Sequence, residues 1–188
     1  MALEIPMRFD SEPLLWTVED VYTPAECDHF IQSIESASPT LATNNPLYRD
    51  QDRVIRDDPA TALDLFERLR PSLSERIGSL SLVGLNSHLR FYRYRPGQRF
   101  APHMDHWYRP DEFHITLHTI LAYFNDDFEG GETRFSEQID RTLVPRRGMV
   151  AIFQHKIRRE GCPVRSGTKY AMRSDVIYGA QEPIGAAG

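Results

Sequence analysis

The spacing of apolar residues changes near Ser87, and this change constrains the fold more than any other feature of the sequence. Before this point apolar side chains recur every three or four residues, as on an amphipathic helix. After it they alternate with polar ones, as on a half-buried strand. Both patterns lie within 188 residues, a length that supports one domain with a single core. The sequence therefore predicts a helical segment packed on a β-rich segment.

Residues 1–86 are expected to be mainly helical and to buttress the strands. Thr23 can cap a helix that has proline at its first position, and Glu26 is placed to complete a capping box. A second helix is expected over residues 58–77, with a stop or bend at Pro71. The polar segment 40–57 between the helices is long for an idle connection, so it predicts either a lid or a solvated loop.

Residues 87–180 are expected to form short strands separated by turns. Strands are predicted near residues 89–94, 113–124, 132–135, 149–153 and 169–178. Pro96-Gly97 and Gly130-Gly131 mark two of the turns between them. Strands of this length and spacing are typical of a β-sandwich, barrel or jelly roll. With the helices, this gives an α+β fold class.

Composition excludes several classes of function. The chain has 22 basic and 27 acidic residues, and this net charge of −5 argues against a nucleic-acid-binding surface. No window of eighteen residues is apolar enough for a transmembrane helix, and the acidic beginning does not resemble a secretory signal. The two cysteines, Cys27 and Cys162, do not make a disulfide framework or a thiolate zinc site. We therefore expect a soluble, cytoplasmic protein that binds neither nucleic acid nor membranes.

His103-Met104-Asp105 is the strongest candidate metal-binding motif. Five of the seven histidines lie between residues 103 and 155, and His103 begins this stretch. In an extended strand residues two apart face the same side, so His103 and Asp105 converge on one point. With a distant histidine they would form the facial triad that holds non-haem Fe(II) and leaves coordination positions open. Taken alone, the same triplet is equally compatible with a polar pair on the surface of a strand.

Four motifs surround this triplet in a specific order. RFYRYRPGQRF (90–100) precedes it, and FEGGETRF (128–135), GCPV (161–164) and GTKYAMRSD (167–175) follow it. Over residues 87–178 this order resembles the Fe(II)- and 2-oxoglutarate-dependent dioxygenases, in the branch that includes prolyl 4-hydroxylases. The resemblance implies a double-stranded β-helix, a jelly-roll variant, over residues 87–180, with residues 1–86 as its helical buttress and lid loop. It also implies Fe(II), 2-oxoglutarate and O2, and the hydroxylation or other oxidation of a small molecule or a peptide side chain.

The resemblance assigns roles to particular residues. His103 and Asp105 match the first two iron ligands of the family. Lys169 matches the basic residue that pairs with the distal carboxylate of 2-oxoglutarate, a group that needs a buried cation. Tyr94 matches a tyrosine that hydrogen-bonds the same carboxylate, and its alternative role is packing in the core.

Three further residues are candidate ligand contacts. Arg173 follows Lys169 by four positions, so both face the same side of the last strand. It would bind a substrate acid or the co-substrate, or else form an internal ion pair with a carboxylate such as Glu132. Trp107 and Arg109 follow the metal motif in a loop and would line a substrate wall, or simply pack that loop.

The third iron ligand is where this sequence departs from the family. The family's distal histidine lies about ten residues before the basic co-substrate residue, and Arg159 stands at that position. A guanidinium has only donors and stays protonated, so Arg159 cannot ligate Fe(II) and becomes a candidate substrate contact instead. The nearby histidine is His155.

Three interpretations of the metal site remain open. In the first, a turn over residues 156–158 brings His155 to the metal. In the second, His103 and Asp105 hold iron alone. In the third, catalysis is lost, and the jelly roll binds a carboxylate ligand or a partner through Lys169 and Arg173.

Overall fold

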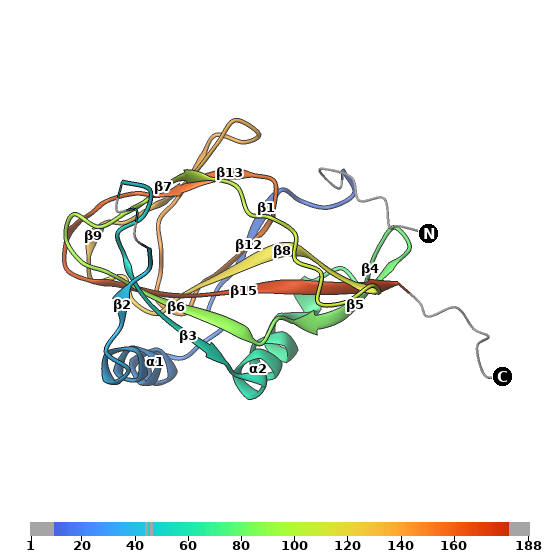
Figure 1. Ribbon diagram of the computed structural model, residues 1–188, viewed down its shortest axis with the longest axis horizontal. Helices are drawn as coiled ribbons and strands as arrows, with labels where there is room; N and C mark the ends of the chain where they lie inside the picture. The colour runs from blue at the N-terminus through green and yellow to red at the C-terminus, as the bar shows by residue number, and fades with distance from the viewer. Residues whose placement is uncertain (1–9, 44, 46, 181–188) are drawn as a thin grey trace.

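The computed structural model describes residues 10–43, 45 and 47–180. Three layers are visible in Figure 1: two helices lie below a large sheet, and a smaller sheet that contains β7 and β13 lies above it. Helix α1 spans Pro24–Ser36, and α2 spans Pro59–Leu69 and leads into a 3-10 turn at Arg70–Ser72. In the part of the chain that the structure describes, neither helix is long and apolar enough to cross a bilayer.

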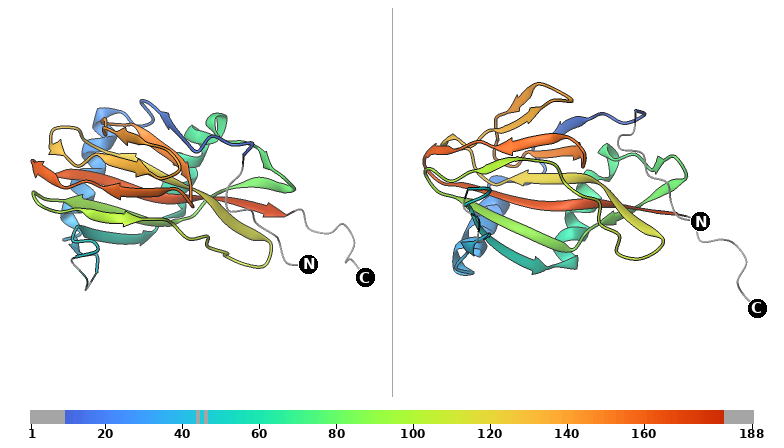
Figure 2. Two further views of the ribbon diagram at one scale, coloured as in Figure 1. Left: turned by 90° about the horizontal axis from the view of Figure 1, so that it is seen from above. Right: turned by 45° about the horizontal axis from the view of Figure 1, so that its top comes forward.

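The large sheet contains nine strands in the described residues, all paired antiparallel. Their order is β1-β12-β8-β15-β6-β3-β2, and β5 joins the edge of β15 and pairs with β4. Their bounds are β1 Leu15–Val18, β2 Thr40–Leu41, β3 Asp52–Asp57, β4 Arg76–Ile77, β5 Leu80–Leu85, β6 His88–Tyr94, β8 His114–Tyr123, β12 Val150–Gln154 and β15 Lys169–Ala180. Figure 2 shows β8, β15, β6 and β3 running side by side in two further views.

A smaller four-stranded sheet faces the large one, with the order β11-β10-β13-β7. Its strands are β7 Phe100–His103, β10 Thr133–Ser136, β11 Arg141–Leu143 and β13 Arg158–Gly161. A two-stranded ribbon of β9 (Glu129–Gly130) and β14 (Val164–Ser166) closes one end. Two antiparallel sheets packed face to face, with helices on the outer face of one of them, confirm the predicted α+β class with a jelly-roll core.

Helix α1 begins as its sequence predicts. The Glu26 amide donates to Thr23 Oγ1 at 3.3 Å, and Glu26 Oε2 accepts from the Thr23 amide at 2.7 Å, which completes the capping box. Along the apolar stripe, Ile34 is fully buried and the Phe30 ring stacks on Phe124 with centroids 4.6 Å apart. The helix is therefore held by packing on the outer face of the large sheet.

The expectation that residues 1–86 are mainly helical is wrong for five segments. Strands β1 to β5 come from this part of the chain and join the large sheet. Residues 73–77 do not continue the second helix, because Pro71 lies in the 3-10 turn and Arg76–Ile77 pairs with β5. Residues 52–57, predicted as loop, form β3, because β6 offers an open edge that β3 covers by antiparallel pairing. Non-local pairing of this kind overrides local sequence preference.

Alternation along the strands places the functional side chains. Met172 of β15 faces the helices, whereas Lys169, Ala171 and Arg173 face the smaller sheet. In β8 the pairing with β15 shifts register beside Leu117, between the Thr116 and His118 pairs, and this irregularity changes which residues face inward. The face of β15 toward the smaller sheet therefore carries two cationic side chains, Lys169 and Arg173.

Candidate active site

A cavity lies between the two sheets, where side chains of their strands point toward each other. Residues of β6, β7, β8, β10, β13 and β15 line this cavity. The lining residues are Tyr92, Tyr94, Phe100, His103, Leu121, Thr133, Arg159, Gly161, Lys169, Ala171 and Arg173. The cavity thus brings together four sequence-predicted residues from the co-substrate and metal motifs with Arg159.

His103 ends β7, directly opposite Arg159 of β13. Its Nδ1 donates to the Ala101 carbonyl oxygen at 2.8 Å, so Nε2 carries the lone pair of the neutral ring. This Nε2 is buried and has no hydrogen-bond partner among the described residues. Burial, helped by the charge of Arg159, lowers the His103 pKa to about 3. The imidazole is therefore neutral, with its lone pair free to accept.

Asp105 is buried and fully engaged by protein donors. Its Oδ2 accepts from Thr119 Oγ1 at 2.5 Å and lies 2.7 Å from Arg159 Nη2. Its Oδ1 lies 3.0 Å from Arg173 Nη1. Burial alone would raise the pKa of this carboxyl, but Arg159 and Arg173 outweigh that effect and hold the pKa well below its usual range. Asp105 is therefore a carboxylate shared by two guanidinium groups.

His155 directly follows β12, and its ring lies beside Asp175 of β15. The predicted turn is present, because the Ile157 amide donates to the Gln154 carbonyl at 3.3 Å. However, His155 Nε2 lies 3.4 Å from Asp175 Oδ1. Within residues 10–43, 45 and 47–180, no group of three or more His, Cys, Asp and Glu side chains is placed to hold a metal ion. The structure therefore does not assemble the expected triad of His103, Asp105 and His155.

Lys169 lines the cavity from the first residue of β15 and is paired across the strands with Tyr94. Its Nζ donates to the Gly131 carbonyl at 2.6 Å and lies about 5 Å from two aromatic rings, 5.2 Å from Tyr94 and 5.1 Å from Tyr123. No carboxylate in the described chain forms an ion pair with it, and burial lowers its pKa to about 8. A buried cation without a counterion is the feature that an anionic ligand would complete.

Arg173 lines the same cavity as Lys169, as their spacing predicts. Its Nη2 lies 3.0 Å from Asp175 Oδ1, and its Nε is buried without a partner in the described residues. The alternative partner Glu132 lies 3.9 Å from Arg165 instead. Asp175 was not singled out from the sequence, although alternation places it on the same face as Arg173.

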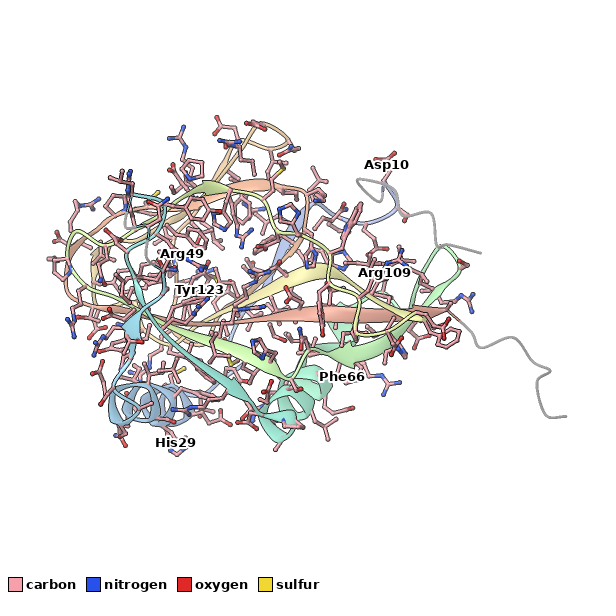
Figure 3. The ribbon with its side chains drawn as sticks, viewed as in Figure 1. Asp10, His29, Arg49, Phe66, Arg109 and Tyr123 are labelled. Carbon is pink, nitrogen blue, oxygen red and sulfur yellow. The ribbon has the colours of Figure 1, made fainter. Side chains whose placement is uncertain are left out.

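The two predicted substrate-wall residues lie outside this cavity. The Trp107 ring lies 4.8 Å from Lys156 Nζ, and Arg109 is exposed. In Figure 3 the labelled Arg109 lies toward the end of β15 near the C-terminus, whereas Tyr123 and Arg49 lie toward the other end. Of Trp107, Arg109 and Arg159, the structure therefore brings only Arg159 to the cavity.

Part of the expected lid borders the cavity. The carbonyl of Tyr48 accepts from the Ala101 amide at 2.8 Å, just beside His103. The guanidinium of Arg49 lies 5.5 Å from the centroid of the Phe100 ring, which itself stacks on His103. The connection between β2 and β3 is therefore anchored on β7 beside the site.

Comparisons with known proteins agree with the fold and the motif order. The sequence profile of the 2OG-Fe(II) oxygenase superfamily matches residues 89–174. Prolyl 4-hydroxylase 1 of Arabidopsis thaliana is 29% identical over 137 residues, which cover 65% of this chain and 47% of that protein. Probable prolyl 4-hydroxylase 8 of the same plant is 26% identical over 133 residues, which cover 66% of this chain and 45% of that protein. The chain thus spans about half the length of these relatives.

Solved prolyl hydroxylase structures share the fold. The viral collagen prolyl hydroxylase of Paramecium bursaria Chlorella virus-1, in its 2OG complex, superposes with a TM-score of 0.67 at 19% identity, covering 90% of this chain and 98% of that one. The Pseudomonas putida prolyl-4-hydroxylase superposes with a TM-score of 0.68 at 15% identity, covering 90% and 94%. At these identities the likeness establishes the fold alone.

The superfamily implies Fe(II), 2-oxoglutarate and O2. The residues present do not fit the metal. A facial triad needs two neutral imidazoles and a free carboxylate. Here Asp105 is engaged by two guanidinium groups and Arg159 stands opposite His103 where a second imidazole is expected. The other half of the site, around Lys169, does fit a carboxylate.

The profile match, the relatives and the shared fold agree with one another and with the motif order. Over residues 89–174 this chain is similar to the 2OG-Fe(II) oxygenase superfamily, and the relatives and solved structures that it resembles are prolyl hydroxylases.

Proposed function

We infer that this protein binds 2-oxoglutarate, or a dicarboxylate of similar length, in the cavity between its two sheets. The observation that carries this proposal is Lys169, a buried ammonium group with no carboxylate partner in the described part of the chain. A charge buried in this way is costly unless it is paired. A ligand carboxylate beside Lys169 would supply the missing charge.

The surroundings of Lys169 support a carboxylate rather than a neutral ligand. Thr133 lines the same space and its hydroxyl is shared with Tyr123 at 2.7 Å. At the other end of the cavity, Arg159 and Arg173 each keep a buried nitrogen without a hydrogen-bond partner in the described chain. Cations at both ends suit a ligand with two carboxylates.

Calorimetric titration of the protein with 2-oxoglutarate tests the proposal. We expect saturable binding that Lys169→Met weakens at least tenfold, because a charge-assisted hydrogen bond is worth about 1.5–3 kcal/mol. Lys156→Met is the matched control, since Lys156 lies over Trp107 outside the cavity and its loss should leave the affinity unchanged. Equal affinities of both variants would refute the role of Lys169.

Hydroxylation of a peptide or small-molecule side chain is the second candidate. The buried, unpartnered Nε2 of His103 favours it, because such a nitrogen is the donor that a metal takes. Relatives named as prolyl 4-hydroxylases, and a Trichoplax adhaerens prolyl hydroxylase solved with a peptide fragment, make peptidyl proline the first substrate to test.

The two candidates differ in one measurable product. Succinate released with Fe(II), 2-oxoglutarate, O2 and a proline-rich peptide would support hydroxylation by the unmodified protein. Binding of 2-oxoglutarate without succinate release would support the dicarboxylate-binding function alone.

A further inference from the structure

We propose that the guanidinium of Arg159 takes the place of the metal ion in this site, so that the cavity binds its dicarboxylate without a metal. This inference rests on the proposed dicarboxylate-binding function and names how the second carboxylate is held. It concerns the end of the cavity opposite Lys169, where Arg159, Arg173 and His103 meet.

Arg159 is fixed as a buried cation. Its position in β13 pairs it with His103 of β7, and its Nη2 lies 2.7 Å from Asp105 Oδ2. The face of the guanidinium lies over the Phe153 ring, 4.5 Å from the centroid. Residue Arg159 is only 5% exposed. Strand pairing, ion pair and ring contact thus hold a permanent positive charge beside the two residues that match iron ligands.

This charge excludes a metal from the same carboxylate. Both oxygens of Asp105 already face guanidinium groups, Arg159 on one and Arg173 on the other. A divalent cation at Asp105 would lie next to two like charges and would have to displace both ion pairs. Guanidinium groups stay protonated at any pH the fold tolerates, so the obstacle does not vanish on titration.

The charges that line the cavity have a positive excess. Arg159, Arg173 and Lys169 line it, and none of the lining side chains in the described residues is a carboxylate. Two carboxylates that do not line the cavity form ion pairs with these arginines. Asp105 pairs with Arg159 and Arg173, and Asp175 pairs with Arg173 and, at 3.4 Å, with Arg90. Two carboxylates therefore face three arginines, and Lys169 adds a further charge. The cavity is left to be neutralised by an anion.

The unpartnered nitrogens identify where the anion binds. Arg159 Nη1 and Arg173 Nε are both buried and both lack a hydrogen-bond partner in the described residues. They belong to side chains that line the cavity beside His103 Nε2, the third unpartnered nitrogen. A carboxylate or 2-oxo acid group would accept from the two guanidinium groups. The ligand class is therefore an α-oxo or plain dicarboxylate whose other end reaches Lys169.

The decisive experiment compares the unmodified protein with Arg159→His in chelator and in Mn(II), a redox-stable probe for the divalent site. In EDTA, calorimetry should show 2-oxoglutarate binding to the unmodified protein, and adding Mn(II) in excess of the chelator should change the affinity less than twofold. Arg159→His should bind at least tenfold more weakly in EDTA and regain affinity with Mn(II). Binding by the unmodified protein that requires Mn(II), or equal affinities of both proteins in EDTA, would overturn the inference.

Two further measurements separate this inference from the proposed function. The EPR signal of free Mn(II) should be unchanged by the unmodified protein and diminished by Arg159→His. Loss of the signal with the unmodified protein would refute the metal replacement even if 2-oxoglutarate binds. Absence of 2-oxoglutarate binding in every condition would refute the proposed function itself. If Arg159→His fails to fold by circular dichroism, Arg159→Gln replaces it and should lose binding in EDTA by the same factor.

Discussion

The guanidinium of Arg159 lies 2.7 Å from the carboxylate of Asp105, and both side chains are buried. Because Arg173 lies 3.0 Å from the other oxygen, two buried cations share one carboxylate, and Arg173 also pairs with Asp175. Removing one of these three buried charges is destabilising, because it leaves an opposite charge without its partner in a poorly hydrated interior. The stability of this site and its capacity to bind anions therefore depend on the same residues.

Asp105→Asn should destabilise the protein by about 3–5 kcal/mol, because it removes the carboxylate that pairs with buried Arg159 and leaves Arg173 with Asp175 alone. Urea unfolding followed by circular dichroism measures this change. Asp140→Asn is the control: Asp140 is an exposed carboxylate, and its replacement should stay within about 0.5 kcal/mol. A loss below about 1 kcal/mol for Asp105→Asn would contradict the structural account of this cluster.

The affinity for 2-oxoglutarate should fall as the pH rises above 8. Lys169 has a pKa lowered to about 8 by burial, and the titratable groups around it are Tyr94, Tyr123, Cys162 and Glu132. Deprotonation removes the charge that pairs with the ligand carboxylate, so affinity should drop up to about tenfold per pH unit. Calorimetry at pH 7, 8, 9 and 9.5 measures the slope.

The free energy of unfolding without ligand should depend on the protonation of Lys169 in the opposite way, so that stability rises with pH where the affinity for ligand falls. The folded pKa of about 8 lies below the ordinary value of 10.5, so between these pH values the unfolded chain holds more protons. The contribution of Lys169 to folding therefore improves as the pH rises through this window. Compared with Lys169→Met, the unmodified protein should gain stability from pH 8 to 10, and an unchanged difference would contradict the lowered pKa.

Local features of the sequence predicted local structure well. The capping box at Thr23 forms because its donors and acceptors lie within one turn of the chain. Alternation over the last strand brought Lys169 and Arg173 to one face, because the period of a strand is fixed by its backbone geometry. The family resemblance, together with the spacing from Lys169, indicated Arg159 at the position of the third ligand, and in the structure Arg159 pairs with His103 across the strands.

Non-local pairing accounts for what the sequence did not reveal. Nothing within β3 indicates that it will cover the edge of β6, so this segment was expected to be a loop. The contact between His155 and Asp175 joins residues twenty positions apart on two strands, and only the assembled sheet shows it. Thr119 reaches Asp105 after the register shift in β8, and a shift of one residue reverses the predicted face.

Gly148→Ala should destabilise the fold by more than Gly97→Ala. Both glycines adopt positive φ, +80° and +87°, where an alanine costs about 1–2 kcal/mol. A Cβ at Gly97 would meet open space, whereas at Gly148 it would collide with the carbonyl oxygen of Tyr22. Gly148 also accepts from the Val21 amide at 2.9 Å, so its backbone cannot shift freely.

Thermal or urea unfolding of the two glycine variants isolates this contact, because the conformational cost is shared and cancels in the comparison. We expect Gly148→Ala to lose at least about 1 kcal/mol more than Gly97→Ala. Equal losses would mean that the segments around Tyr22 and Gly148 separate without cost.

Glu26 should stabilise the protein at neutral pH and stop doing so in acid. Its carboxylate lies 2.6 Å from Arg68 Nη2 and accepts from the Thr23 amide, and these contacts lower its pKa from 4.5 to about 2. A lowered folded pKa means that the contribution is complete above 4.5 and disappears as the pH falls toward 2. Glu26→Gln should therefore cost about 1 kcal/mol at pH 7, a value typical of a partly exposed cap and ion pair.

The pH dependence distinguishes this charge effect from a packing effect of Glu26→Gln. Urea midpoints of the variant and the unmodified protein should converge between pH 4.5 and pH 2, since protonated Glu26 and glutamine carry the same charge. Glu67→Gln is the control, because Glu67 lies 4.0 Å from Arg70 on the exposed side of α2 and its replacement should change little at any pH. A difference at pH 2 as large as that at pH 7 would show that Glu26 acts through its shape and not through its charge.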